Sequence, residues 1–412
     1  MLITNIKGLV GIHPEEKKVL RGSEMGNLPV LENAWLLLKD GFIDDFGPMS
    51  NLEAQYAERE TLNAAGQFVF PSWCDSHSHI VFAASREEEF VMKIEGKTYE
   101  EIATAGGGIL NSAQKLGLAT EDSLFESASL RVRDLIKQGT GALEIKSGYG
   151  LTVESELKIL RVIKRLKNAF PIPIKATLLA AHTYPQAYKN NHQGYVDLII
   201  KELLPLVAKE KLADYIDVFC ERGFFSVEET DLILSAAAKF SLKPKIHANQ
   251  LSVSGGVQIG VQHLAVSVDH LEETDEDTLN ALANSPTIAT LLPSCSFYLN
   301  IPFANARGLL EKRAAVALAS DYNPGSTPSG NMNFVVSLAC IKLKMKPEEA
   351  INAATLNGAA AMELSAEMGS IARGKRANLF ITRAMPSVAY LPYSFGQTQI
   401  ETVILNGEVY HG

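Results

Sequence analysis

The sequence predicts an α/β fold: a (β/α)8 barrel of the TIM type, with a small β-sandwich domain that both chain termini build. The length of 412 residues exceeds one ordinary domain and suits a barrel with a smaller companion. Apolar runs alternate with amphipathic segments through the middle of the chain, as in successive βαβ units. Strand-like runs with Gly and Asn-Gly turns occupy both ends. We therefore expect a small composite β domain at 1–66 and 373–412, and the barrel at 67–372.

The two ends of the chain carry the strands expected in the small domain. Near the start, residues 2–12 and 32–47 are short apolar runs, and Lys39-Asp40-Gly41 marks a hairpin inside the second run. Near the end, residues 369–384 and 399–410 have the same texture, and an Asn-Gly pair supplies a turn. We expect these runs to meet in one small domain outside the barrel.

The barrel strands are expected at eight apolar runs rich in β-forming residues. In chain order these runs are Phe68–Asp75, Ala142–Ser147, Ile172–Ala181, Tyr215–Glu221, Pro244–Ala248, Val266–Leu271, Thr287–Leu292 and Ala315–Asp321. Amphipathic patterns predict helices between and after them, at Ser123–Gly139, Val153–Asn168, Val227–Phe240, 333–345 and 347–364. The order is strand then helix throughout, which is typical of a parallel sheet.

Composition limits the partners and the location of the protein. Lys and Arg number 38 against 47 Asp and Glu, and the net charge of -9 argues against nucleic acid or an anionic membrane surface as a partner. The 4 cysteines are far apart and never form Cys-x-x-Cys, so they indicate neither a disulfide framework nor a zinc ribbon. The sequence has no pattern of a secretory leader and no uncharged apolar stretch of about 20 residues. We expect a cytoplasmic protein.

Titratable residues at the ends of several expected strands indicate a metal site. The segment 75–79, Asp-Ser-His-Ser-His, closes the first run, and alternation along a strand turns both of its imidazoles to one face. His247 lies on the fifth run, His270 on the sixth, and Asp321 ends the eighth. The carboxyl ends of barrel strands meet at one mouth, where active sites of this architecture lie. Imidazoles with a carboxylate suit a divalent metal such as zinc, or iron, with an open position for water.

Such a site predicts a hydrolase. A bound metal lowers the pKa of water to about 7 and polarises a neighbouring carbonyl or imine carbon. Each residue also has a structural interpretation, because a lone strand histidine such as His270 or His182 is more often a core residue, and Asp321 could cap the next helix. The coincidence of His-x-His with His247 and Asp321 at other strand ends favours the metal site.

Longer motifs resemble a known family. They are GQFVFPSWCDSHSHIVFAASREEEF, TYEEIATAGGGI, EIKSGYGL, LLAAHTYP, IHANQLS, VDHLE, ASDYNPGS and EEAINAATLNGAAAMEL, followed by GSIARGKRANLFI. On these motifs, which cover nearly the whole chain, the sequence resembles the amidohydrolase superfamily and, within it, the imidazolonepropionase family. One departure is PSWCD, where members of the superfamily commonly have Pro-Gly before the Asp. It affects the expected turn and leaves the expected ligands in place.

The resemblance implies an activity and a set of residues. It implies hydrolysis of the cyclic amide of 4-imidazolone-5-propanoate to N-formimidoyl-L-glutamate in histidine degradation, by a homodimer. It implies one zinc or iron ion per chain, bound by His77, His79, His247 and Asp321. It assigns Arg86 to the substrate carboxylate, and it assigns further contacts with substrate or product to Tyr149, His182, Gln250, Asn323, Gly325 and Ser326. Lys146 is followed by a Gly-Tyr-Gly loop, as in the one-metal subgroup, whereas two-metal relatives carboxylate a strand lysine.

These assignments lead to a mechanistic hypothesis. A metal-bound hydroxide, oriented by His270 and Asp321, attacks the lactam carbonyl, and one of these two groups protonates the leaving nitrogen. Gln250 is excluded as a base because an amide can only hydrogen-bond. Arg86 offers a planar fork to the carboxylate, although without the resemblance we would favour its pairing with the run Glu87–Glu89. We interpret Gly106–Gly108 as a lid over the pocket.

Two alternatives stay open. The first is another reaction of the superfamily, such as deamination of a guanine-like or cytosine-like ring, which would have no use for a carboxylate clamp at Arg86. The second is a non-catalytic scaffold, although scaffolds of this fold usually lack the metal ligands that are all present here. The dependence of KM on Arg86 tests the first alternative, and the metal content of the protein tests the second.

Overall fold

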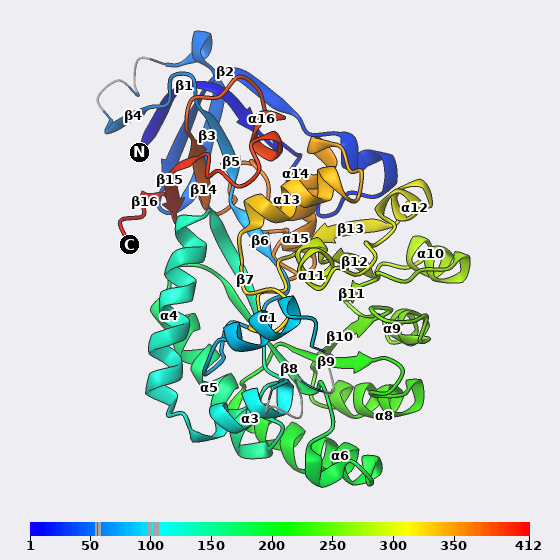
Figure 1. Cartoon of the computed structure of the whole chain (residues 1–412). Helices are drawn as coiled ribbons and strands as arrows, with labels where there is room; N and C mark the ends of the chain where they lie inside the picture. Colours follow the sequence, from blue (N-terminus) through cyan, green and yellow to red (C-terminus); the bar gives the residue numbers. More distant parts are fainter. Residues whose placement is uncertain (54–55, 57–58, 98–100, 102–106) are drawn as a thin grey trace.

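The structure is a computed structural model that describes residues 1–53, 56, 59–97, 101 and 107–412. Figure 1 shows a ring of strands with helices around it, next to a sheet that holds both termini. The arrangement confirms the predicted α/β barrel with a smaller β structure from the two chain ends.

Eight parallel strands form the barrel in the described part of the chain. They are β6 (Trp73–Asp75), β7 (Thr140–Lys146), β8 (Ile174–Ala181), β9 (Tyr215–Cys220), β10 (Lys243–Ala248), β11 (Ser267–His270), β12 (Ile288–Leu291) and β13 (Ala315–Leu318). Hydrogen bonds join neighbours in chain order. The two end strands meet just beyond their carboxyl ends, where His79 N donates to Tyr322 O at 2.8 Å and Asp321 N donates to His77 O at 2.9 Å. The barrel is therefore nearly closed, and its seam lies at the predicted metal ligands.

Both ends of the chain build one sheet. Its strands are β1 (Leu2–Val10), β2 (Val30–Lys39), β3 (Phe42–Pro48), β4 (Thr61–Asn63), β5 (Phe68–Pro71), β14 (Leu379–Thr382), β15 (Ile400–Leu405) and β16 (Glu408–Val409). The hydrogen-bonded order is β16-β15-β14-β5-β1-β2-β3, with β4 beside β1, so these strands follow one continuous path. The Asp40-Gly41 and Asn406-Gly407 pairs have the positive φ values that a two-residue hairpin turn requires.

The prediction that Phe68–Asp75 is a single barrel strand is wrong, because this run divides between the two sheets. β5 pairs with β1 and β14 of the terminal sheet, whereas β6 pairs with β7 of the barrel. Pro71 has no N–H group with which to continue a ladder, so the chain can change sheets at this point. The exact domain limits stay a prediction, but β5 lies in the terminal sheet although its residues follow position 66.

Helices surround the barrel (Figure 1). They are α1 (Glu87–Ile94), α3 (Ile109–Leu118), α4 (Glu121–Lys137), α5 (Val153–Ala169), α6 (His192–Leu198), α7 (Leu204–Glu210), α8 (Val227–Ala238), α9 (Gly256–Gln262), α10 (Glu276–Ala283), α11 (Pro293–Leu299), α12 (Ala306–Glu311), α13 (Met332–Ile341), α14 (Pro347–Ala354), α15 (Leu356–Ala360) and α16 (Tyr390–Tyr393). Thr120 and Thr152 cap α4 and α5 through their side chains. The single helix predicted over 347–364 is wrong, because the backbone leaves helical geometry at Thr355 (φ -116°, ψ -88°).

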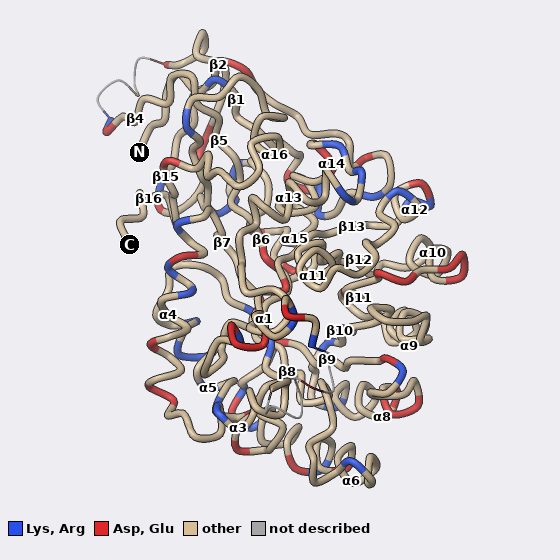
Figure 2. The backbone as a smooth tube through the Cα atoms, viewed as in Figure 1, with Lys and Arg blue, Asp and Glu red and all other residues tan. Residues whose placement is uncertain are grey.

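Apolar residues form separate cores in the two β structures. One cluster fills the space between the barrel strands and the helices, and another lies within the terminal sheet, with Ile3, Leu36 and Leu379 among its members. Figure 2 shows that charged residues lie mainly along the outer helices and loops. No helix in the described ranges combines the length and the apolar character that crossing a bilayer would require.

Candidate metal centre and active site

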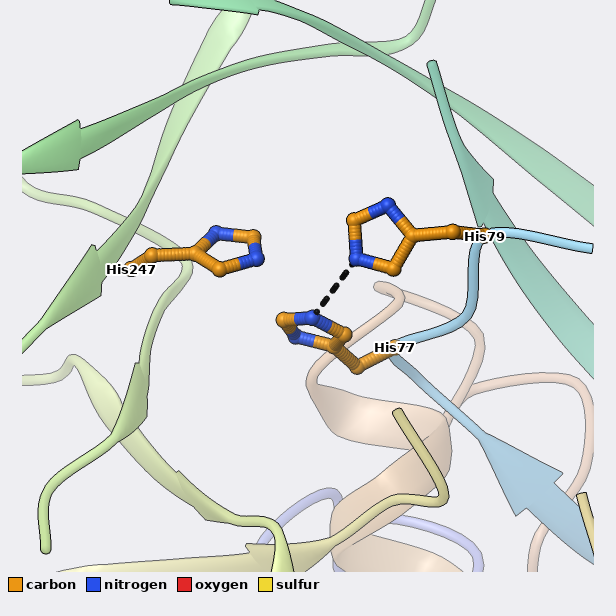
Figure 3. Close-up of side chains that lie close together, drawn as sticks. All are labelled: His77, His79 and His247. Atoms are coloured by element: carbon orange, nitrogen blue, oxygen red, sulfur yellow. Dashed lines mark hydrogen bonds between the residues drawn. The ribbon is translucent and has the colours of Figure 1, made fainter. Parts of the chain in front are cut away.

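Three imidazoles meet at the carboxyl ends of the barrel strands. His77 and His79 follow β6, and His247 lies on β10. One ligating atom from each lies within 4.8 Å of the others, and all three side chains are buried. The Nε2 atoms of His77 and His79 are 3.2 Å apart, and Figure 3 shows the three rings turned toward a common point. We call these residues the imidazole layer.

Hydrogen bonds to two of the three imidazoles, His77 and His79, favour a lone pair on the inward nitrogen of each of these two rings. Each Nδ1 atom faces an oxygen: Asp269 Oδ2 at 2.7 Å from His77, the carbonyl of Ser147 at 3.4 Å from His79, and Asp217 Oδ2 at 3.0 Å from His247. A proton on Nδ1 of His77 and of His79 satisfies the first two acceptors and places the lone pair on Nε2, whereas His247 Nδ1 approaches Asp217 without making a hydrogen bond to a described residue. Burial, and then neighbouring imidazoles and Lys146, lower the pKa of all three rings. Neutral imidazoles with converging lone pairs fit a cation.

Asp321 lies beside the imidazole layer. Its Oδ1 atom is 3.5 Å from His77 Nε2 and 3.6 Å from His79 Nε2. The last barrel strand is shorter than the predicted run Ala315–Asp321, because β13 ends at Leu318. Asp321 follows the strand and has a left-handed backbone conformation, with φ of 54°. This conformation is unfavourable for a residue with a side chain and is held here by the hydrogen bond of the seam. Burial raises the pKa of Asp321 to about 6.

A layer of buried charges lies beneath the imidazoles. Its members come from four strands, their side chains have no solvent exposure, and they are Glu144, Lys146, Asp217, Lys245 and Asp269. Lys146 Nζ lies 2.7 Å from Asp217 Oδ2, 2.8 Å from Glu144 Oε1 and 3.3 Å from Asp269 Oδ2, and Lys245 also pairs with Glu144. We call this set the charge layer. Asp269 accepts from His77 Nδ1, and Asp217 Oδ2 lies 3.0 Å from His247 Nδ1, so the charge layer contacts two of the predicted metal ligands from below.

The charge layer as a unit is not predicted by the sequence patterns. Its signal was present, because charged residues stand at alternate positions of otherwise apolar runs, as Glu144 and Lys146 do in ALEIKS. Alternation alone assigns such residues to one face of a strand. It does not show that residues of opposite charge from other strands reach the same point.

A cavity of about 570 Å³ opens over the imidazole layer. The structure brings nearly all of the predicted site residues together around it, namely His79, Arg86, Tyr149, His182, His247, Gln250, His270, Asp321, Asn323, Gly325 and Ser326. His77 lies below the cavity wall with no exposed surface. Pockets of this size hold small molecules, and apolar side chains such as Phe219, Phe224 and Leu299 share this wall with the polar groups.

Arg86 lines the cavity but is paired. Its Nε atom donates to Glu89 Oε1 at 2.8 Å and its Nη2 atom donates to Glu89 Oε2 at 2.5 Å. The pairing with the acidic run, one of the two interpretations drawn from sequence, is therefore present. The third nitrogen, Nη1, lies against Gly325, where an added Cβ would be 2.3 Å away. Glycine is required there because the guanidinium occupies the space of a side chain.

His182 and Tyr149 form one wall of the cavity. The His182 ring is nearly parallel to that of His79, with centroids 5.6 Å apart, and its Nδ1 atom is 3.1 Å from the carbonyl of Gly148. Gly148 has φ of 111°, and a Cβ there would lie 2.8 Å from the same ring. Burial lowers the pKa of His182 to about 4, so the ring is neutral near pH 7 and can present a hydrogen-bonding nitrogen.

His270 ends β11 in a strained backbone, with φ of 86°. Its Nδ1 atom lies 3.4 Å from Glu272 Oε1. Burial by itself lowers the pKa of this imidazole, but the carboxylates of Glu272, Asp321 and Asp269 together outweigh burial, and the net shift of the pKa is upward. His270 is therefore better suited than the imidazole layer to hold a proton.

Three further residues predicted to contact the substrate or product, Asn323, Gly325 and Ser326, lie in one turn. Asn323 Oδ1 accepts from the backbone N–H groups of Gly325 and Ser326, both at 2.8 Å, and Asn323 Nδ2 donates to Ser326 Oγ at 2.7 Å. Gln250 Nε2 donates to Cys295 Sγ at 3.5 Å. The residues of the turn hold one another, and both the turn and Gln250 border the cavity.

Sequence patterns did not predict every residue near the cavity. One residue of the predicted lid is also not among the described residues. Lys93 lines the cavity and its Nζ atom donates to Gly325 O at 3.4 Å, but no motif distinguishes it from other helix lysines. Glu272 and Cys295 were also missed. Gly106 is outside the described residues. Gly108 N donates to Glu89 Oε1 at 3.0 Å, and the lid stays a prediction.

The chain is similar to proteins of known family. The model of the amidohydrolase family matches residues 68–410. The chain is 53% identical over 409 residues to an imidazolonepropionase of Christiangramia forsetii, and 54% identical over 408 residues to an imidazolonepropionase of Flavobacterium johnsoniae. Each match covers 99% of this chain and 99% of the relative.

Solved structures share the fold. A triazine hydrolase variant has a TM-score of 0.76 at 16% identity, covering 99% of this chain and 94% of that chain. An adenosine deaminase of Xanthomonas campestris with bound zinc has a TM-score of 0.69 at 15% identity, covering 99% of this chain and 92% of that chain.

Proposed function

The chain belongs to the amidohydrolase family and is a hydrolase of histidine degradation, and we propose how its residues carry out imidazolonepropionase activity. The substrate is 4-imidazolone-5-propanoate, and addition of water across its cyclic amide gives N-formimidoyl-L-glutamate. The observation that carries the proposal is the convergence of three neutral imidazoles at the base of a cavity that Arg86 also lines.

We propose that His77, His79, His247 and Asp321 hold one zinc or iron ion. Nitrogen and oxygen donors of this kind suit either metal. When bound, the ion acidifies a water molecule and polarises the amide carbonyl. Lys146, the strand lysine that could otherwise be carboxylated, has its ammonium surrounded by three carboxylates, and these charges raise its pKa despite burial. A protonated amine does not form a carbamate, which argues against a pair of ions bridged by a carboxylated Lys146.

The carboxylate tail of the substrate is proposed to bind at Arg86 and Lys93. Two nitrogens of Arg86 are held by Glu89, so its Nη1 edge is the part that faces Gly325 and the turn. Lys93 supplies a second positive charge at the same turn, through its contact with Gly325 O. Holding the tail fixes the position of the ring in the cavity. The reacting groups then do not have to meet by diffusion, which raises the rate.

The ring is proposed to lie between His182 and His270. His182 and Tyr149 hydrogen-bond the ring, since His182 is neutral and Tyr149 is buried beside it with centroids 5.6 Å apart. His270 and Asp321 move the proton: one accepts it from water as the carbonyl carbon is attacked, and the leaving ring nitrogen receives it as the C–N bond breaks.

The four cysteines are free thiols, three of them buried. Free thiols persist in a reducing compartment, and on this ground we propose the cytoplasm as the location.

The test is loss of the imidazolone chromophore, measured with freshly prepared substrate against a sample without enzyme. Arg86→Met should raise KM about tenfold to a hundredfold, because a charge-assisted hydrogen bond is lost, and should change kcat less. Arg307→Met is the matched control, since Arg307 makes a similar two-point pair with Glu349 outside the cavity. Turnover of guanine in place of the imidazolone, or no effect of Arg86→Met on KM, would refute the proposed substrate.

A further inference from the structure

We propose a second cation site, formed by His270, Glu272 and Cys295, next to the imidazole layer. One ligating atom from each of the three side chains lies within 4.8 Å of the others, and all three residues are buried. None of these atoms belongs to the four ligands proposed for the first ion. His270 ends β11, Glu272 follows it by two residues, and Cys295 lies in the first turns of α11.

The carboxylate of Glu272 is only half satisfied. Its Oε1 atom accepts from Ser296 Oγ at 3.1 Å and lies 3.4 Å from His270 Nδ1. Its Oε2 atom is buried and has no hydrogen-bond partner among the described residues. A buried carboxylate oxygen without a partner is costly, and a cation held with His270 and Cys295 would satisfy it.

The donor set selects the class of ion. Sulfur, imidazole nitrogen and a single carboxylate suit a thiophilic divalent cation such as Zn²⁺ or Cd²⁺, whereas Mg²⁺ and Ca²⁺ require more oxygen ligands. Ligand atoms around one such ion are about 3.3–3.8 Å apart, so side-chain shifts of about an ångström would close the site. On binding, the Cys295 thiol releases its proton to solvent. The thiolate and the carboxylate then balance the two positive charges.

The site borders the cavity through His270, which forms part of the cavity wall, whereas Glu272 and Cys295 lie behind it. Gln250, which also lines the cavity, already points its amide at Cys295 Sγ. If His270 transfers a proton during hydrolysis, an ion bound to it would remove this group from the reaction. This consequence rests on the proposed function. The second ion would therefore inhibit, and an excess of a thiophilic metal would lower activity that one equivalent of metal supports.

The binding test uses the full chain loaded with one equivalent of zinc and dialysed against Cd²⁺. Both metals are counted by mass spectrometry, and the ultraviolet sulfur-to-cadmium charge-transfer band is recorded. The wild type should retain its zinc, gain one equivalent of cadmium and develop the band. Cys295→Ser should lose the cadmium and the band but keep the zinc, and Glu272→Gln should bind cadmium more weakly. Cys340→Ser, which changes the one half-buried cysteine of the four, is the control and should behave as the wild type does.

Failure to gain cadmium, or retention of the band in Cys295→Ser, would overturn the site whether or not the imidazolone is hydrolysed. The parallel activity test expects hydrolysis by the wild type to fall about a hundredfold as the band develops, which is the contribution typical of a general acid or base. In Cys295→Ser the same cadmium should have no such effect. If cadmium binds at Cys295 but the rate of hydrolysis does not change, the second site stands and inhibition through His270 is overturned. Failure of the site and failure of the proposed function are therefore distinguishable.

Discussion

The imidazole layer and the charge layer are adjacent, equally buried and connected, but they are satisfied in opposite ways. In the charge layer, each charged group has a partner of opposite sign within the chain, as Lys146 has with Asp217 and Glu144. In the imidazole layer, the Nδ1 atoms of His77 and His79 have hydrogen-bond partners in the chain, whereas the inward nitrogens of these two rings face one another. On this difference we propose that the charge layer supports the fold and that the imidazole layer binds a ligand. Four predictions test it, and they follow in decreasing order of expected effect.

Loss of a ring from the imidazole layer should abolish activity and leave the fold intact. We expect His247→Ala to lower kcat/KM at least about a thousandfold, because the chemistry of the bound ion is worth several kcal/mol. Metal content and the imidazolone assay measure the effect, and denaturant unfolding of the metal-free protein should change little. His263→Ala is the control, since His263 pairs with Asp231 away from the cavity. Full activity of His247→Ala would contradict the assignment of the site.

Loss of the central cation from the charge layer should instead destabilise the fold. Lys146→Met leaves three carboxylates without their shared ammonium, and we expect the free energy of unfolding of the metal-free protein to fall by about 3–5 kcal/mol. Lys175→Met is the matched control, because Lys175 lies on the neighbouring strand β8, is partly exposed and is 3.9 Å from Asp214. An equal and small effect of both substitutions would show that the charge layer does not stabilise the barrel.

The contact between the layers should affect metal affinity. Asp269→Asn keeps the shape of the side chain but removes the charge that holds the proton on His77 Nδ1. We expect a tenfold to hundredfold loss of metal affinity, measured by competition with a chelator. Asp231→Asn changes the other His–Asp contact of 2.7 Å, with His263, and should leave metal affinity unchanged. Equal affinities in the two variants would disprove orientation of His77 from below.

The smallest effect is expected at the edge of the charge layer. Ser267 Oγ donates to Asp269 Oδ1, and Ser267→Ala removes one buried hydrogen bond to a charged group. We expect a loss of about 1 kcal/mol in stability and little change in metal affinity. Ser127→Ala on α4 removes a bond to a helix carbonyl and serves as comparison. A change in metal affinity as large as that of Asp269→Asn would indicate that Ser267 and Asp269 act as one unit.

Strand-end reasoning predicted much of the site. The alternation of His77 and His79, with His247 and Asp321 at other strand ends, placed four groups at one mouth, and the structure brings them together. It could not show that Asp321 lies beyond the end of β13 in the left-handed region. That position depends on the seam bond to His77, which joins residues far apart in the chain.

Pairing between side chains was harder to predict. The sequence allowed Arg86 either to pair with the acidic run or to meet the substrate, and the fold places it where it pairs with Glu89 while its remaining edge faces Gly325. The strand run at 68–75 likewise contains no signal for the change of sheets, apart from the proline at its centre.

The order of strands and helices, and the residue types at the strand ends, are properties of the sequence alone, because periodicity and turn residues act locally. Which nitrogen of each imidazole bears the proton, which carboxylates share the Lys146 ammonium, and which edge of Arg86 reaches the cavity were decided only by the tertiary structure. The physical reason is that these interactions join neighbours in space from separate strands, and their energies depend on burial and on distances that no local pattern encodes.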